Sequence, residues 1–238
     1  MSQIKKEKIS VIIPVFNEYE SIGKVLDDIP RSLVDEIVVV DNGSTDGSDL
    51  VAGQHGATVI KEPEMGYGAA CLRGISYLKE TGAPQILIFL DGDYSDYPED
   101  MIQLVDKIRE GYDFVLGSRV LGVQKGLAQL SSHSILGNKL AGFFLRWLFG
   151  GNFTDLGPFR AIKFEKLLQL KMADRNFGWT MEMQIKSVRH KLKIVEIPIQ
   201  YRNRFGGTSK VTGTLLGSIK AFAKITLIVI LYFFRIKK

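Results

Sequence analysis

The chain alternates short runs of apolar residues with stretches in which apolar residues recur at helical spacing. Five apolar runs, each bounded by polar turns, predict buried strands at residues 9–15, 36–40, 58–60, 86–90 and 114–116. Apolar residues three and four positions apart predict helices at about 21–29, with Ser21 as N-cap, 68–79 and 101–108. Strands that alternate with helices predict an α/β fold with a mostly parallel sheet, covered by helices on both faces.

Polar side chains follow three of the predicted strands at the point where each strand ends. Asn17 and Glu18 follow the first strand, Asp41 follows the second, and Asp91 and Asp93 follow the fourth. Because ligands of parallel α/β sheets bind beyond the carboxyl ends of the strands, we expect these side chains to form one site.

Asp91 and Asp93 offer two carboxylates one residue apart at the end of a buried strand. Mg²⁺ and Mn²⁺ prefer such oxygen ligands, take one or two carboxylates, and fill their other positions with phosphate oxygens and water. The alternative is an ordinary polar turn, because Asp-Gly pairs are common in turns. Asp96 lies three residues beyond Asp93 and is either a further ligand or outside the site.

Three other nucleotide-binding folds do not fit the pattern. A dinucleotide-binding domain needs a G-x-G-x-x-G motif directly after the first strand, where this chain has Pro14–Glu18 without a glycine. The nearest match, at Gly66–Cys71, follows the third strand and lacks the last glycine. A P-loop lysine motif is absent, and so is the glycine-rich basic loop that a nucleotidyltransferase has after its first strand.

Composition and charge bound the class of protein. With 238 residues, of which 45% are hydrophobic and 24% charged, the chain can form one large domain or a domain with an extension. Its single cysteine, Cys71, suits a reducing compartment, and no secretory signal is visible. Residues 197–238 hold eight Lys or Arg and no Asp or Glu. Their neighbours are Leu, Ile and Phe, which favours an anionic membrane over nucleic acid.

Two apolar segments bear on membrane association. Residues 140–149 carry Arg146 and Trp147 as an interfacial helix would, although a buried helix fits equally well. Residues 215–234 are long enough to span a bilayer, but they include Lys220 and Lys224, which are costly at its centre. We therefore expect 213–238 to form an apolar, basic helix that lies on the membrane surface. A membrane span, or packing on the domain or on a partner, remains the alternative.

Several motifs, taken in order, resemble those of family 2 glycosyltransferases with the GT-A (nucleotide-diphospho-sugar transferase) fold. They are Pro14–Glu18, Asp41–Gly47, Gly66–Ala69, Asp91–Asp93 and Gly117–Arg119. Asp155–Arg160 and Tyr201–Lys210 resemble later motifs of the dolichyl- and polyprenyl-phosphate hexosyltransferases within that family. The resemblance covers about residues 9–212 and implies a GT-A domain over 1–212.

This resemblance implies a role for each rim residue. Pro14, Val15 and Phe16 would line the base of a nucleotide sugar, Asp41 would accept hydrogen bonds from the base, and Glu18 would face the ribose. Gly66 belongs to the same set of donor contacts. Asp91 and Asp93 would hold Mg²⁺ or Mn²⁺ on the diphosphate, and Asp93 would also act in catalysis. Asp41 could instead cap its turn, and Glu18 could simply begin a helix. Related enzymes often have Gln where this chain has Ser95, a weaker ligand.

The acceptor determines which further groups the site needs. A phosphate monoester is already anionic near neutral pH and needs cations, whereas a hydroxyl acceptor needs a general base. Candidate cations are Arg119, Arg160, Arg202, Arg204 and Lys210, of which Arg119 and Arg202 are preferred. Candidate bases are Asp155 and Glu182, although Glu182 could equally hold an arginine in place.

We therefore predict an inverting, metal-dependent hexosyltransferase that uses UDP- or GDP-hexose. Its acceptor would be a polyprenyl or dolichyl phosphate, and the enzyme would be peripheral to the cytoplasmic membrane face, with no nucleic-acid partner. One alternative is transfer to a soluble or glycan hydroxyl, and another is a catalytically silent protein that binds nucleotide sugars.

Overall fold

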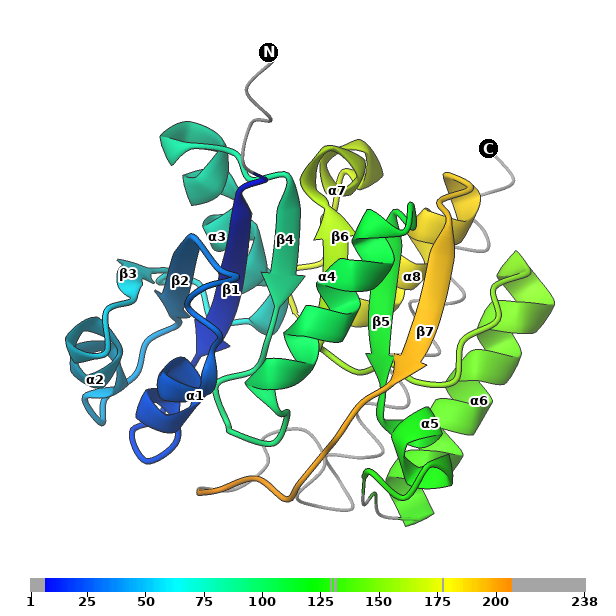
Figure 1. Cartoon of the computed structure of the whole chain (residues 1–238), viewed down its shortest axis with the longest axis horizontal. Coiled ribbons are helices and arrows are strands. Elements are labelled where there is room, and N and C mark those ends of the chain that lie inside the picture. Colours follow the sequence, from blue (N-terminus) through cyan, green and yellow to red (C-terminus); the bar gives the residue numbers. More distant parts are fainter. Residues whose placement is uncertain (1–6, 129, 131, 177, 207–238) are drawn as a thin grey trace.

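A computed structural model describes residues 7–128, 130, 132–176 and 178–206. These residues form a seven-stranded sheet in the order β3-β2-β1-β4-β6-β5-β7 (Figure 1). The strands are β1 (Ile9–Val15), β2 (Glu36–Asp41), β3 (Thr58–Lys61), β4 (Ile86–Phe89), β5 (Phe114–Ser118), β6 (Arg160–Lys163) and β7 (Ile194–Pro198). The first five confirm the positions of the predicted strands, although β3 is only partly buried, and β6 and β7 were not predicted.

The sheet is mostly parallel, as expected, with one reversed strand. β1 pairs in parallel with β2 and β4, β2 with β3, and β5 with β7. β6 lies antiparallel between β4 and β5, so that Arg160 at its start is opposite Phe89 and Leu116. This reversal brings the residues that precede β6 to the edge of the sheet where β4 and β5 end.

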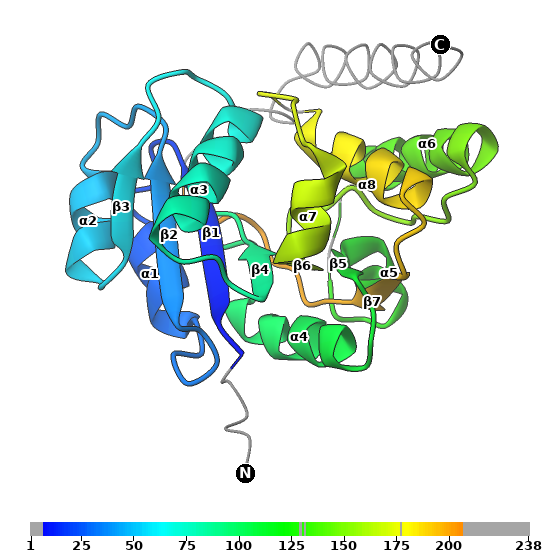
Figure 2. The ribbon, with the colours of Figure 1, turned by 90° about the horizontal axis from the view of Figure 1, so that it is seen from above.

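Helices cover both faces of the sheet (Figure 2). They are α1 (Ile22–Asp28), α2 (Ser48–Gln54), α3 (Tyr67–Thr81), α4 (Met101–Arg109), α5 (Arg119–Gln124), α6 (Ser132–Phe149), α7 (Phe164–Leu170) and α8 (Trp179–Arg189), with a 3-10 turn, η1, at Pro98–Asp100. Residues of α1, α2 and α4 share one core layer with Val11 and Ile13, and residues of α3, α6, α7 and α8 share the other with Ile12. Because successive side chains of a strand point to opposite faces, a strand covered on both sides reads as a continuous apolar run.

The three predicted helices are confirmed as α1, α3 and α4, but the predicted cap of α1 is corrected. Ser21 does precede α1, yet its side chain makes no capping hydrogen bond to the helix. Its hydroxyl instead donates to the backbone carbonyl and the carboxylate of Glu18, each at 3.2 Å. Ser21 therefore helps to fix the loop between β1 and α1.

The apolar segment 140–149 forms the second half of α6 and combines both predicted environments. Ala141 and Leu145 are buried, whereas Phe143 is 59% and Trp147 72% exposed. None of the helices in the described part of the chain has the length and apolar character needed to span a membrane. The predicted helix at 213–238 and the predicted domain boundary at 212 lie outside the described residues.

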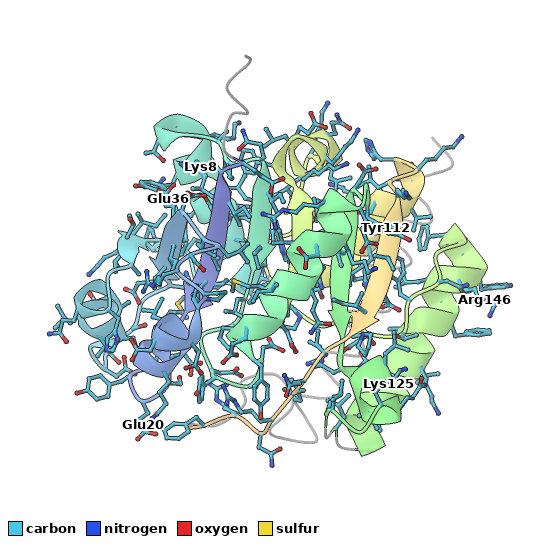
Figure 3. The ribbon with its side chains drawn as sticks, viewed as in Figure 1. Lys8, Glu20, Glu36, Tyr112, Lys125 and Arg146 are labelled. Atoms are coloured by element: carbon cyan, nitrogen blue, oxygen red, sulfur yellow. The ribbon has the colours of Figure 1, made fainter. Side chains whose placement is uncertain are left out.

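After β7, residues 199–206 form an extended segment, which we call the strap. It runs along the edge where the parallel strands end, towards α1 (Figure 1). The backbone amides of Arg202 and Phe205 donate to the carbonyls of Ser95 and Asp93, respectively. Glu20 lies at this same edge, whereas the ion pair of Lys8 and Glu36 lies at the opposite one (Figure 3). The strap therefore packs against the loop that carries the predicted cation ligands.

Candidate active site

The corner between β1 and β2 holds Asp41 in a fixed orientation. Asp41 pairs with Val15 across the strands, is only 3% exposed, and accepts the backbone N–H of Ser44 at 3.0 Å through Oδ1. The amide of Asn42 donates to the carbonyls of Glu62 and Glu64 and accepts the N–H of Gly66. Asp41 thus does cap its turn, as the alternative predicted, but it does so through one of its two oxygens.

The loop after β1 is tied to the loop after β2 by polar side chains. Asn17, with φ 55°, accepts the N–H of Thr45, and its own N–H donates to the Ser44 hydroxyl. The N–H of Glu18 donates to the Ser48 hydroxyl at 2.7 Å. A cavity of about 300 Å³ opens beside this loop. It is lined by Asn17, Glu18, Tyr19, Glu20, Ser21, Asp46 and Gly206.

Gly66 and Gly68 allow two loops to pack closely. A Cβ atom at Gly66 would lie 2.1 Å from the Arg175 carbonyl oxygen, and one at Gly68 would lie 2.0 Å from that of Asp174. The N–H groups of Gly68 and Ala69 at the start of α3 donate to the carbonyls of Asn176 and Arg175. These backbone amides are therefore bonded to carbonyls of this chain. The role of Gly66 that the structure shows is close packing against the loop at residues 174–176.

Asp91 and Asp93 lie at the end of β4, in different environments. Oδ1 of Asp91 is buried and has no hydrogen-bond partner within the described residues. Burial and the nearby Asp93 raise the pKa of Asp91 to about 7, against the opposing effect of a hydrogen bond from Tyr67. Asp93 accepts both the N–H and the hydroxyl of Ser95, at 3.0 and 2.6 Å. Ser95 therefore orients Asp93.

Asp96 is a third carboxylate close to this pair. It is 3% exposed, and neither of its oxygens has a hydrogen-bond partner within the described part of the chain. Burial, followed by the nearby Asp91, raises the pKa of Asp96 well above its usual value. An unpaired buried carboxylate is costly in its charged form, so this environment favours the neutral form of Asp96.

This donor set fits a divalent cation that also binds a diphosphate. Across the described ranges, no three Asp, Glu, His or Cys side chains are grouped closely enough to hold a metal ion by themselves. Mg²⁺ and Mn²⁺ need only one or two carboxylates, and the unpaired Asp91 oxygen is a ligand of the hard type that they prefer. Asp91 and Asp93 are therefore suited to a cation that takes its remaining ligands from phosphate and water.

Arg204 of the strap contacts two of the carboxylates predicted to bind the nucleotide sugar and its cation. Its guanidinium bonds to the Glu18 carboxylate, and its Nη1 lies 3.6 Å from Oδ2 of Asp93. Arg202, which we preferred from the sequence, is bonded elsewhere: its Nε donates to the Tyr94 carbonyl at 2.7 Å. The shared motif identified both arginines, but only the path of the strap shows which one faces the carboxylates.

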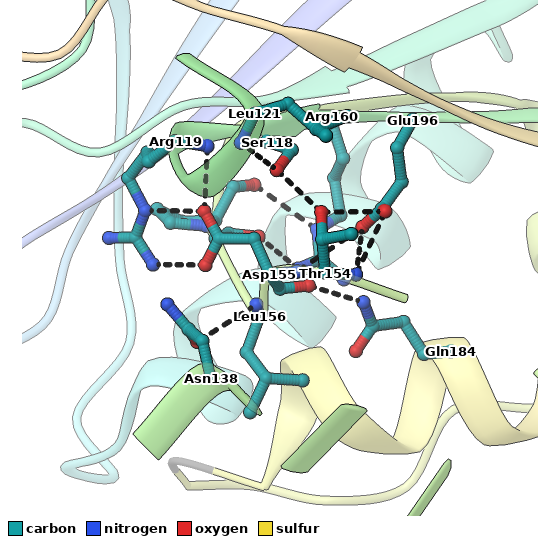
Figure 4. Close-up of polar contacts among 12 residues, drawn as sticks. Ser118, Arg119, Leu121, Asn138, Thr154, Asp155, Leu156, Arg160, Gln184 and Glu196 are labelled. Atoms are coloured by element: carbon teal, nitrogen blue, oxygen red, sulfur yellow. Dashed lines mark hydrogen bonds and ion pairs between the residues drawn. The ribbon is translucent and has the colours of Figure 1, made fainter. Parts of the chain in front are cut away.

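Arg119 and Asp155 form a buried ion pair (Figure 4). Nε and Nη2 of Arg119 donate to the two oxygens of Asp155 at 2.8 and 2.7 Å, and the Arg119 backbone N–H adds a third bond at 2.8 Å. Burial alone would raise the pKa of Asp155, but the Arg119 guanidinium holds it below its usual value. Asp155 is therefore a weak base in this arrangement.

Three elements hold the loop that carries Asp155 (Figure 4). Gln184 of α8 donates to the Asp155 carbonyl, and Asn138 of α6 accepts the N–H of Leu156. Glu196 of β7 accepts both the N–H and the hydroxyl of Thr154. The loop before β6 is therefore fixed by α6, α8 and β7 together.

Arg160, predicted as a phosphate ligand, and Glu182, predicted as a candidate base, are both bonded to backbone groups. Arg160 is 1% exposed and donates to the carbonyls of Gly157, Pro158 and Thr180, and its burial lowers its pKa to about 10. Glu182 is fully buried, accepts the N–H groups of Ala173 and Asp174, and pairs with Lys186 at 2.7 Å. Neither a phosphate ligand nor a general base is expected from side chains so engaged. Lys210 lies outside the described residues.

Comparisons with known proteins place this chain in a family. Residues 10–170 match the model of "Glycosyl transferase family 2". The chain is 34% identical to an uncharacterized glycosyltransferase of Mycobacterium tuberculosis over 217 residues, which cover 90% of this chain and 94% of that protein. It is 31% identical to a dolichyl-phosphate hexose transferase of Haloferax volcanii, with 87% of this chain and 89% of that protein covered.

A second sequence relative and a solved structure extend these findings. The chain is 28% identical to an undecaprenyl-phosphate mannosyltransferase of Micrococcus luteus, with coverage of 88% of this chain and 90% of that protein. Glucosyl-3-phosphoglycerate synthase of M. tuberculosis, solved with Mn²⁺, UDP and phosphoglyceric acid, superposes with a TM-score of 0.74 at 22% identity. That superposition covers 96% of this chain and 78% of the other, and it establishes the GT-A fold.

Proposed function

Because the chain belongs to glycosyl transferase family 2 and is a glycosyltransferase, we propose that it transfers a hexose from a nucleotide sugar to a polyprenyl phosphate. One observation carries this choice of acceptor. Both carboxylates predicted as bases are engaged, Asp155 by Arg119 and Glu182 by Lys186 and backbone amides. A hydroxyl acceptor needs a base, whereas a phosphate monoester is already an anionic nucleophile.

The donor would bind across the ends of β1 and β2. Pro14, Val15 and Phe16 would line the base, and Asp41 would accept a hydrogen bond from it through the oxygen that Ser44 does not occupy. Glu18 would face the ribose once Arg204 exchanges its bond to Glu18 for a phosphate oxygen. Binding of UDP by structural neighbours supports a nucleoside diphosphate donor of this kind.

Asp91 and Asp93 would hold Mg²⁺ or Mn²⁺ on the diphosphate. When bound, the cation acts as a Lewis acid and counter-charge for the leaving nucleoside diphosphate. Ser95 keeps Asp93 oriented through two hydrogen bonds. Arg204, already next to Asp93, would offset further negative charge on the diphosphate. The solved neighbours with Mn²⁺ or Mg²⁺ and UDP support a divalent cation of this type.

The acceptor phosphate would approach from the side of Arg119. Nε and Nη2 of Arg119 hold Asp155, so Nη1 remains to donate to a phosphate oxygen. Attack of that oxygen on the sugar carbon, opposite the leaving diphosphate, inverts the anomeric configuration. Arg119 would thus bind and orient the nucleophile, and Asp155 would keep Arg119 in place.

The exposed face of α6 supports a lipid acceptor. Leu140, Phe143 and Trp147 recur at helical spacing and are 38%, 59% and 72% exposed. Arg146 on the same helix points away from the domain (Figure 3), as a side chain that meets anionic headgroups would. Because Asn138 links α6 to the Asp155 loop, a lipid along α6 could place its phosphate near Arg119. We therefore propose that the enzyme is peripheral to the cytoplasmic face of the membrane.

Transfer from a panel of radiolabelled UDP- and GDP-hexoses tests this function. The full chain is incubated with polyprenyl phosphate in detergent, with Mn²⁺ or Mg²⁺ or with EDTA. We expect an organic-extractable product of inverted configuration, which is lost with EDTA. Product formed only on a soluble or glycan hydroxyl would show that the acceptor is a hydroxyl and not a polyprenyl phosphate. A protein that binds nucleotide sugars and transfers none of them would be the silent alternative.

The α6 face allows a matched test of membrane contact. Leu140→Ser on α6 is compared with Leu168→Ser on α7, because these leucines are 38% and 39% exposed. We expect Leu140→Ser, and more strongly Trp147→Ser, to lower cosedimentation with phosphatidylglycerol vesicles several-fold. Leu168→Ser should leave it unchanged. Equal binding by all three variants would show that α6 does not contact the bilayer.

A further inference from the structure

The loop that carries the predicted cation ligands, residues 91–97, is clamped by Arg202, and we refer to it as the cation loop. We propose that Arg202 is a positioning residue, which sets the affinity of this loop for a divalent cation bound to a nucleoside diphosphate without contacting either of them. The inference rests on the proposed cation site at Asp91 and Asp93. It replaces the phosphate-binding role that the sequence predicted for Arg202.

The cation loop has a backbone conformation that must be held from outside. Tyr94, which directly follows Asp93, has φ 62°, in the left-handed region that residues with a side chain seldom adopt. Such conformations persist where the surrounding contacts determine them, and they cluster at functional sites. The contacts that hold Tyr94 should therefore influence where Asp93 points.

Arg202 supplies several of those contacts. Its guanidinium carbon lies 3.4 Å from the ring centroid of Tyr94 and 4.1 Å from that of Tyr97. Its Nε donates to the Tyr94 carbonyl at 2.7 Å, and its backbone N–H donates to the Ser95 carbonyl at 2.9 Å. The side chain thus packs on two rings of the cation loop and bonds to the backbone next to Asp93.

Neighbouring groups extend this clamp to α1. The Tyr94 hydroxyl donates to Asp28 at 2.6 Å, and Nη2 of Arg202 lies 3.8 Å from the same carboxylate. The ring of Phe205 packs edge-on against Tyr94, and its N–H donates to the Asp93 carbonyl. Arg202 is therefore central to a cluster that joins α1, the cation loop and the strap.

The two arginines of the strap differ in whether a bound ligand could replace their contacts. Arg204 makes ion pairs with Glu18 and Asp93, which a cation and a nucleotide could replace. Arg202 contacts two rings and a carbonyl, and its Nη2 is buried with no hydrogen-bond partner among the described residues. The contacts with the two rings depend on the planar shape of the guanidinium, and a lysine ammonium cannot stack in that way.

The test measures Mn²⁺ affinity by electron paramagnetic resonance, with UDP and with GDP, for full-length wild type, Arg202→Lys and Arg202→Met. We expect both variants to bind Mn²⁺ with the better nucleotide at least tenfold more weakly, so that the charge of lysine does not rescue binding. The KM for polyprenyl phosphate should change less than twofold. Tyr97→Phe should resemble wild type, and Tyr97→Ala should weaken Mn²⁺ binding about threefold.

The control is Lys24→Met, which removes a cation 4.5 Å from the ring of Phe205 and should leave Mn²⁺ affinity unchanged. Wild-type Mn²⁺ affinity in Arg202→Lys, with a raised KM for the acceptor, would assign Arg202 to the acceptor phosphate and overturn the inference. Wild-type affinity in both Arg202 variants would overturn it as well. If Arg202→Met does not fold, Tyr97→Ala decides, because it keeps Arg202 and removes one ring. Failure of the wild type to bind Mn²⁺ with either nucleotide would instead refute the proposed function.

Discussion

The acidic side chains on the two sides of the candidate site differ in how they are satisfied. On the donor side, Asp96 and the Oδ1 atom of Asp91 are buried, and both acids keep oxygens without a hydrogen-bond partner among the described residues. On the proposed acceptor side, Asp155 and Glu182 are buried as well, but an arginine or a lysine and backbone amides satisfy them. The comparison teaches that burial alone does not mark a functional carboxylate.

This difference has a physical reason. Burying a carboxylate without a partner is costly, so a fold keeps such a group where a ligand can supply the missing charge. A buried carboxylate with a cation and hydrogen bonds is part of the scaffold, and removing one partner leaves the other uncompensated. We therefore propose ligand binding by Asp91 and Asp93 on the donor side and structural support by the acids on the proposed acceptor side. Five measurements test that assignment.

Asp93→Asn should have the largest effect, on activity. We expect kcat/KM for hexose transfer to fall at least about a thousandfold, equivalent to about 4 kcal/mol, because one cation ligand loses its charge. Asn keeps an oxygen for the two Ser95 hydrogen bonds, so the melting temperature should change little. The exposed Asp106→Asn on α4 serves as the control. Equal kcat/KM values for the two variants would show that Asp93 has no role in the reaction.

Asp155→Asn should have the largest effect on stability. It leaves the Arg119 guanidinium, whose side chain is 18% exposed, without its counter-charge. We expect the free energy of unfolding to fall by about 3 kcal/mol, as for other broken buried ion pairs. Urea unfolding measures this change. A variant as stable as the wild type, but inactive, would contradict the structural role and favour a base at Asp155.

The same pair predicts a pH dependence. Because the pKa of Asp155 is lower in the folded chain than its usual 3.8, the pair contributes stability above pH 3.8. That contribution is lost as the pH falls through the folded pKa. The stability gap between wild type and Asp155→Asn should therefore narrow below pH 3.8, as measured by urea unfolding at a series of pH values. A stability difference between wild type and Asp155→Asn that increases below pH 3.8 would contradict this prediction.

Glu182→Gln should destabilise the chain by a smaller amount. The glutamine keeps one oxygen for the N–H groups of Ala173 and Asp174 and loses the charge that pairs with Lys186. We expect a loss of about 2 kcal/mol in the free energy of unfolding, with kcat near that of the wild type at a temperature where both are folded. A fall in kcat of a hundredfold or more at unchanged stability would return Glu182 to the role of a base.

Asp96→Asn should have the opposite sign and the smallest size. Because both oxygens of Asp96 lack partners within the described chain, removal of its charge should stabilise the metal-free protein by about 1 kcal/mol. Differential scanning calorimetry in EDTA measures this as a raised melting temperature. A lowered melting temperature would show that Asp96 has a partner in solution and belongs with the satisfied acids.

Much of the fold could be predicted because β1, β2, β4 and β5 are buried on both faces. Their continuous apolar runs are visible without any knowledge of contacts. β6 and β7 were missed because Arg160–Lys163 begins and ends with a basic residue, and Ile194–Pro198 contains Glu196 and ends in proline. The antiparallel direction of β6 depends on which strands it meets, which the local pattern does not encode.

The location of the site could be predicted, but the bonding partners of its side chains could not. Asp41, Asp91 and Asp93 follow strands, and parallel strands end at one edge, so the sequence predicts that they converge. That Asp155 is held by Arg119, or that Arg204 and not Arg202 meets Asp93, depends on paths between distant segments. The only local hint was that both arginines of the strap lie in one motif.

The most direct test compares two lipid acceptors that differ in a single group. Hexose transfer to a polyprenyl phosphate and to the matching polyprenol is measured side by side, with the same nucleotide sugar and Mn²⁺. The account predicts transfer to the phosphate and none detectable to the alcohol, because the predicted bases are engaged in scaffold contacts. Transfer to the polyprenol at a comparable rate, abolished by Asp155→Asn or Glu182→Gln in folded protein, would contradict it.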